Sequence, residues 1–164
     1  METGEILTTI AEISVALAGF GGIAAGLGYR SRGDWNDQDR FRLLVMVAVS
    51  LGIIFACLVP HTLQKFGRVD YWLLSSIPVM IIPFCNLTIQ YRLFRRGLPE
   101  GFSLATTVSI LASNVVGLVF LLSLVLGFAQ EETQEGFYVV AILSLLVTPA
   151  TLFLRLIVTS FVEE

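Results

Sequence analysis

Charged residues are scarce in this sequence. Its 164 residues include 10 Lys and Arg and 13 Asp and Glu, so that 14% are charged and 55% are hydrophobic. A soluble domain carries roughly 25% charged residues, and a disordered chain needs low hydrophobicity with high charge. Both classes are excluded, and the mean hydropathy of +0.83 indicates an integral membrane protein whose first partner is the lipid bilayer. No nucleic-acid partner is expected, because the net charge is −3 and such binding needs a basic patch.

Metal-ligating and nucleophilic residues are equally few. Cys57 and Cys85 both lie in apolar runs, His61 is the single histidine, and no CxxC motif occurs. Neither a disulfide framework nor a zinc site fits this pattern, so no metal or cofactor is expected. The run GFGG at residues 19–22 lies inside an apolar stretch, where a phosphate loop does not belong. Because HExxH and GxGD are absent, we expect no enzyme, with a membrane-embedded hydrolase using Glu12 and His61 as the exception.

Five apolar runs are long enough to cross a membrane as helices, which takes about 20 residues each. Strand-like alternation is absent, so the sequence predicts an all-α, polytopic transmembrane helix bundle in one domain, residues 1–164. The spans are predicted at residues 6–28, 41–63, 71–94, 104–129 and 137–162. The first is the weakest, because it contains Glu12 and five glycines, and a helix lying along the membrane surface is the alternative. The acidic start METGE argues against a signal peptide.

Basic residues flank the spans unevenly. The first and third loops with their flanks hold seven arginines, namely Arg30, Arg32, Arg40, Arg42, Arg92, Arg95 and Arg96. The opposite side has only Lys65 and Arg68. Because basic loops stay in the cytoplasm, we expect the N-terminus outside, the C-terminus in the cytoplasm, and a plasma or bacterial inner membrane. The seven arginines are also expected to contact anionic lipid headgroups.

Small residues line the first span. Glu12, Gly19 and Gly26 recur at heptad spacing, beside a stripe formed by Ser14, Ala18, Gly22 and Gly26. Small side chains allow helix backbones to approach closely. The stripe therefore predicts either a pore-lining or oligomer-contact face, or close packing within one subunit.

The fifth span carries a polar stripe. Ser144, Thr148, Thr151 and Arg155 fall within about 60° of one another around the helix axis. One interpretation of this pattern is a wetted pathway with an arginine constriction. The alternative is an arginine that extends to the membrane interface while the hydroxyls bond back to their own helix.

Depth decides which polar groups can meet. Glu12 and His61 fall in the outer third of the membrane, and they are the better pair by depth. Such a pair would make the outer mouth sensitive to external pH; the alternative is that Glu12 bonds a backbone group while His61 lies in the headgroup region. Glu12 and Arg155 differ by ~15–20 Å in depth, so we expect Arg155 to cluster with Asn86 or Asn114 instead. The pore or polar-core candidates are Glu12, His61, Asn86, Gln90, Asn114, Ser144, Thr148, Thr151 and Arg155.

Two functions are compatible with these features. One is a homo-oligomeric channel or transport-like pore between copies, because the five helices of a single copy leave little room for a pathway within that copy. Acidic residues at the outer rim favour cations and an inner arginine ring favours anions, so the ion sign stays open. The other is a non-transporting accessory, scaffold or effector subunit that docks on a larger membrane partner through the glycine-rich first helix.

Overall fold

The computed structural model describes residues 3–32, 37–67, 70–95 and 104–162, and these form helices and short connections without a strand. The helices are α1 (Thr3–Arg32), α2 (Asp37–Lys65), α3 (Tyr71–Val79), α4 (Ile81–Arg95), α5 (Leu104–Val125), the short 3-10 helix η1 (Glu131–Thr133) and α6 (Gln134–Val162). Five stretches are long and apolar enough to span a membrane, with α3 and α4 together forming the third. The prediction of an all-α protein with five apolar helices is confirmed.

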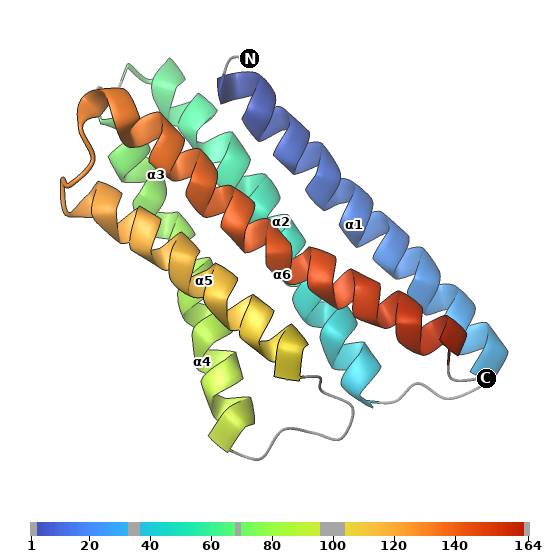
Figure 1. The fold of residues 1–164 in the computed structure, drawn as a ribbon. Helices are drawn as coiled ribbons and strands as arrows, with labels where there is room; N and C mark the ends of the chain where they lie inside the picture. Colours follow the sequence, from blue (N-terminus) through green and yellow to red (C-terminus); the bar gives the residue numbers. More distant parts are fainter. Residues whose placement is uncertain (1–2, 33–36, 68–69, 96–103, 163–164) are drawn as a thin grey trace.

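The five spans alternate in direction, so that the two ends of the chain lie at opposite ends of the bundle (Figure 1). The α6 helix is central and packs on α1, α2, α3 and α5. The α1 helix runs along α2 and α6 over much of its length (Figure 1). The first apolar run is therefore an integral member of the bundle and does not lie across one end of it.

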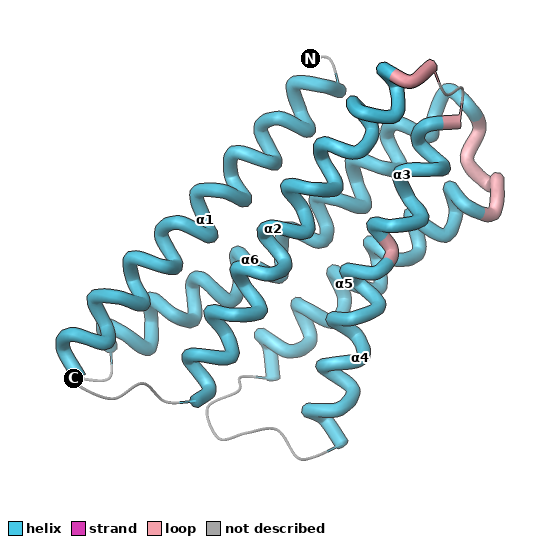
Figure 2. Tube along the Cα trace, turned by 180° about the vertical axis from the view of Figure 1, so that it is seen from behind, coloured by secondary structure: helices cyan, strands magenta, loops and turns pink. Residues whose placement is uncertain are grey.

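Two prolines divide the third span. The sequence predicts one helix over 71–94, whereas the structure has a break at Met80 between α3 and α4. Pro78 and Pro83 cannot donate backbone hydrogen bonds, and their rings crowd the preceding turn. Beyond the break, α4 packs on α5 and diverges from α2 (Figures 1 and 2).

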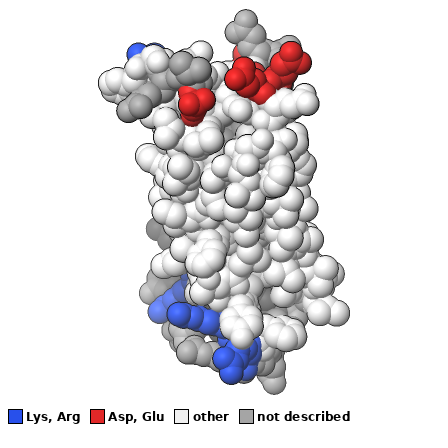
Figure 3. All heavy atoms as spheres, turned by 90° about the vertical axis from the view of Figure 1, so that its left-hand side faces the viewer, with Lys and Arg blue, Asp and Glu red and all other residues white. Residues whose placement is uncertain are grey.

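Charge and exposure follow the pattern of a membrane protein. On the face that Figure 3 shows, acidic residues lie at one end of the bundle beside a small basic patch, most basic residues lie at the other end, and no charged residue is seen between them. We call these the acidic end, which includes Glu5, Asp70 and Glu135, and the basic end, which includes Arg40 and Arg95. Large apolar side chains are exposed along the band, among them Phe20, Phe55, Phe84, Leu126 and Leu154. A surface of this kind is stable against lipid tails and unfavourable in water.

In the core, a tyrosine of one helix bonds to a backbone carbonyl that a proline leaves free in another helix. Pro60 lies inside α2 and has no amide hydrogen to donate to the carbonyl of Ala56, four residues earlier. The hydroxyl of Tyr138, from α6, donates to that carbonyl at 2.7 Å. The Tyr138 ring is fully buried and packs against Trp72 with ring centroids 5.3 Å apart. A backbone acceptor freed by Pro60 is thus satisfied from a neighbouring helix.

Candidate functional site

The α1 helix presents two seams, each with alternating spacings of three and four residues. The inner seam faces the bundle and consists of Leu7, Ile10, Ser14, Leu17 and Gly21, which are buried or half-buried. The outer seam is exposed at every position and consists of Glu12, Val15, Gly19, Gly22 and Gly26. Such spacing is the pattern by which helices pack lengthwise on one another, so α1 carries a second packing face that the described residues leave uncovered.

Glycine contacts separate the two seams. A Cβ atom added at Gly21 would lie 1.8 Å from Cε of Met46, so α1 and α2 approach closely there. A Cβ atom at Gly19, Gly22 or Gly26 would have nothing within 4 Å. Close packing within one subunit is therefore not the role of these three glycines, and the close contact falls on Gly21.

The remaining stripe residues lie closer to the bundle. Ser14 is fully buried and donates a hydrogen bond of 2.9 Å to the carbonyl of Ile10. Ala18 is half-buried. The predicted stripe therefore divides between two faces of α1, because residues four apart drift around the helix by about 40° at each step.

Glu12 lies on the outer seam at membrane depth. It is about 13 Å along the helix axis from Thr3, which exceeds the ~6 Å of polar interface on each side of a bilayer. Its side chain is exposed, and none of the described residues bonds to it. An ionisable group at this depth normally faces a bundle interior or a watery cavity, and the described residues of one chain give Glu12 neither.

His61 lies at the acidic end, away from Glu12. A Cβ atom added at Gly4 would be 3.2 Å from Cε1 of His61, and Glu12 is about 12 Å further along α1. The expected Glu12–His61 pair is wrong, because the rise along each helix does not fix the offset between helices. His61 instead lines a hollow of about 250 Å³ with Gln64 and Glu135.

Three polar side chains join α4, α5 and α6. The amide nitrogen of Asn86 donates to Oδ1 of Asn114 at 3.1 Å, and Nδ2 of Asn114 donates to Oγ1 of Thr148 at 2.9 Å. Nδ2 of Asn114 also donates to the carbonyl of Ile110 at 2.8 Å. Asn114 and Thr148 are almost completely buried. This polar triad fixes the packing of three helices, and both asparagines take part in it.

The polar stripe of α6 does not act as one unit. Ser144 donates to the carbonyl of Ala141 at 2.7 Å, and Thr151 donates to that of Val147 at 2.6 Å. Nε of Arg155 donates to Oγ1 of Thr106 at 3.2 Å. Ser144 and Thr151 thus bond back to their own helix, and the arginine is bonded to α5 and not to the expected asparagines.

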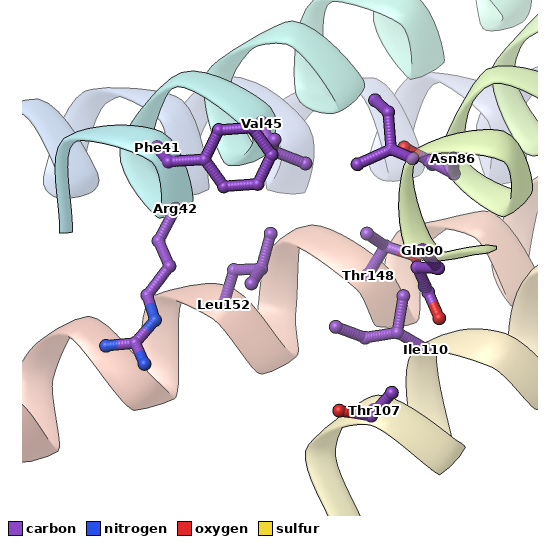
Figure 4. Close-up of a pocket in the computed structure, with 10 residues that line it drawn as sticks. Phe41, Arg42, Val45, Asn86, Gln90, Thr107, Ile110, Thr148 and Leu152 are labelled. Carbon is purple, nitrogen blue, oxygen red and sulfur yellow. The ribbon is translucent and has the colours of Figure 1, made fainter. Parts of the chain in front are cut away.

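A small cavity lies between α2, α4, α5 and α6 near the basic end (Figure 4). Its volume is about 50 Å³, and its polar walls are formed by Arg42, Asn86, Gln90, Thr107 and Thr148. Arg42 is 5% exposed, so the expectation that it contacts lipid headgroups from the surface does not hold. From the sequence, Arg42 is grouped with the loop arginines because it lies at the start of an apolar run. The rotation of α2 about its axis directs the Arg42 side chain into the bundle. The buried Oε1 of Gln90 has no hydrogen-bond partner.

The other loop arginines that the structure describes lie outside the cavity. Arg40, Arg92 and Arg95 are exposed near the basic end. The side chains of Arg30 and Arg32, and Arg96 as a whole, lie outside the described residues. The lipid contacts predicted for all of these residues stay predictions.

No metal cluster occurs in the part of the chain that the structure describes, since no three His, Cys, Asp or Glu side chains come together there. Cys57 is buried and Cys85 exposed, and both are free. Comparison with protein families, with curated proteins and with solved structures gives no match to this chain. The function is therefore argued from the membrane-compatible bundle and from the residues described above.

Proposed function

We propose that this chain forms a homo-oligomeric, cation-conducting membrane pore in which the outer seam of α1 faces other copies. The observation that carries this proposal is the exposed carboxyl group of Glu12 at membrane depth. It lies on the same face as three glycines with nothing within 4 Å of an added Cβ. Glycines allow backbones to approach closely, and a water-filled pathway between copies would hydrate the carboxylate.

The bundle interior supports a pathway between copies instead of through one. The cavity of about 50 Å³ is confined to the basic half. Toward the acidic end the core is filled by buried side chains that include Leu7, Ile53, Leu121 and Ile142. Packed apolar layers of this kind hold no water column.

The ion sign follows from which charges share the outer seam. Glu12 lies on this seam, and a ring of carboxylates favours cations. Arg155 is bonded to Thr106 of α5, so an arginine ring on the same pathway is not part of the proposal. Acidic residues at the entrance would concentrate cations further.

Orientation and membrane follow from the arginines of the basic end. By the excess of basic residues in cytoplasmic loops, the basic end faces the cytoplasm and the N-terminus lies outside. The membrane is then a plasma or bacterial inner membrane. No catalysis is assigned, and the hydrolase alternative is weakened by the separation of Glu12 from His61.

A matched pair of substitutions tests the pore. In native mass spectrometry from nanodiscs, we expect several copies of the wild type. Gly22→Leu should release single copies whose helical content and melting are unchanged, because its Cβ meets no neighbour. Gly21→Leu should lower the stability of the fold, since overpacking costs typically 1–3 kcal/mol. Oligomers that persist in Gly22→Leu would contradict the proposed interface.

Conduction is measured in proteoliposomes loaded with potassium chloride. Wild type should pass potassium in preference to chloride, and Glu12→Gln should assemble but lose most of that preference. A wild type that is always a single copy bound to one larger protein would favour the accessory function, which uses the same outer seam. Assembly without flux of either ion would refute the pore.

A further inference from the structure

The hollow beside His61 is enclosed by residues of four helices at the acidic end. Its volume is about 250 Å³. Its walls come from the first turns of α1, the last turns of α2, the start of α3 and the start of α6, which lie at the same end of the bundle (Figures 1 and 2). Sites for drug-sized ligands have volumes of about 300–1,000 Å³, so this hollow is suited to a smaller molecule.

Two aromatic rings form one wall of the hollow. Tyr71 and Trp72 begin α3, and both line the hollow. Their ring centroids are 4.9 Å apart, and the ring planes are tilted by 41°. Trp72 also packs against the buried ring of Tyr138, with centroids 5.3 Å apart, so the core holds the indole in place. The faces of such rings attract cations.

The charge that lines the hollow is negative. Glu135, in the first turn of α6, is half-buried and forms part of the wall. None of the described residues that line the hollow is Lys or Arg. Glu5 and Asp70 lie at the same end and add to the negative potential. Lys65 follows the wall residue Gln64 but is exposed and does not line the hollow. A cation is therefore favoured over an anion.

The remaining wall residues indicate which kind of cation fits. Divalent metal ions need several carboxylate or imidazole ligands, and no three such groups come together among the described residues. An alkylated ammonium group needs no hydrogen-bond acceptors, and its methyl groups can contact ring faces. His61 and Gln64 lie on consecutive turns of α2, and the amide of Gln64 can donate to a hydroxyl group or accept from one.

We propose that this hollow binds a small quaternary ammonium cation that carries a hydroxyl group, of the choline class. The trimethylammonium group contacts Tyr71 and Trp72 beside the carboxylate of Glu135, and the hydroxyl group bonds to Gln64. None of the residues that line the hollow belongs to the outer seam of α1, so the site stands independently of the proposed pore.

A titration followed by NMR of the ligand methyl protons tests the site. The full chain is kept in non-ionic maltoside micelles at about pH 8, above the usual titration range of histidine. The probes are choline and its uncharged analogue dimethylbutanol, in which a tert-butyl group replaces the trimethylammonium group. We expect choline to bind at least about tenfold more tightly than dimethylbutanol, because only choline is attracted by the carboxylate and the ring faces.

A matched pair of substitutions tests the carboxylate. Glu135→Gln should weaken choline binding about fivefold or more and leave dimethylbutanol binding unchanged. Glu132→Gln removes an exposed charge of η1 at the same end, outside the hollow. This control should keep choline affinity within about twofold of the wild type, because exposed charges interact weakly in water.

Two substitutions test the aromatic wall. Trp72→Phe should weaken choline binding about threefold or more, because phenylalanine attracts cations less strongly than tryptophan. Tyr71→Leu removes the other ring without changing the contact between Trp72 and Tyr138, and it should also weaken choline binding. Thermal melting by circular dichroism shows whether each variant is folded. Tyr91→Leu, at an exposed tyrosine outside the hollow, is the control and should bind choline as the wild type does.

Glycerophosphocholine distinguishes the two sources of the cation. Choline binding that is at least about fivefold tighter would assign the free cation, because Glu135 repels the phosphate. Equal binding would assign the headgroup of phosphatidylcholine, and either result supports the ammonium site. Absence of choline binding, equal affinity for choline and dimethylbutanol, or equal losses in Glu132→Gln and Glu135→Gln would each overturn the proposal. Displacement of choline by an equal concentration of potassium chloride, or unchanged binding in both Trp72→Phe and Tyr71→Leu, would also overturn it.

Discussion

Removing one hydroxyl group should weaken the core of the bundle. Tyr138→Phe deletes the donor that bonds to the Ala56 carbonyl at 2.7 Å, whose usual partner in the helix is missing at Pro60. The phenylalanine ring keeps the contact with Trp72, whose centroid lies 5.3 Å from that of the tyrosine. The substitution therefore isolates the hydrogen bond from the aromatic packing.

The expected cost is about 1–2 kcal/mol. Interhelical hydrogen bonds in membrane proteins contribute ~0.6 kcal/mol on average and up to ~1.7. A buried carbonyl left without a donor costs about 1–3 kcal/mol. The upper part of that range is expected, because Ala56 and Tyr138 are fully buried and lipid tails have no donor to offer the carbonyl.

A double-mutant cycle gives the sharper measurement. In Pro60→Ala, residue 60 regains an amide hydrogen for the Ala56 carbonyl, so Tyr138→Phe should cost about 1 kcal/mol less than in the wild type. The free energy of unfolding is followed by circular dichroism in mixed micelles with increasing dodecyl sulfate. Tyr91→Phe, at an exposed tyrosine, is the matched control and should change stability by less than ~0.5 kcal/mol. An equal cost of Tyr138→Phe in both backgrounds would refute this account of the proline.

Two other substitutions probe the contacts of α5 in the same unfolding assay. Asn114→Leu removes the hydrogen bonds of Asn114 to Asn86 and Thr148. It should lower the free energy of unfolding by about 1–3 kcal/mol, because buried polar groups are left unpaired. An unchanged unfolding midpoint would mean that the triad contributes no stability. Gly117→Val should lower the free energy of unfolding by about 1–3 kcal/mol through overpacking, because a Cβ atom at residue 117 would lie 2.9 Å from Oγ of Ser144. A variant as stable as the wild type would show that α5 and α6 separate at little cost.

The sequence by itself determined the elements and their chemical ends. Burying about 20 apolar residues in lipid is favourable whatever the neighbouring helices do. Each span is therefore readable from its own residues, and so is the division between acidic and basic loops. The break at Met80 was missed, because the sequence predicts one helix over 71–94, although the donors that Pro78 and Pro83 lack depend only on the prolines themselves. An asparagine inside an apolar span needs hydrogen-bond partners whatever its neighbours are. The polar triad supplies these partners for Asn86 and Asn114.

Only the tertiary structure decided how the helices are rotated and offset. Gly21 and Gly22 are neighbours in the sequence, but one packs against Met46 and the other has nothing within 4 Å. The same rotation places Arg42 in the cavity while Arg40 stays exposed. The offset between α1 and α2 separates Glu12 from His61. These relations depend on close packing between side chains of different helices, and helical periodicity within one span contains no information about the partner helix.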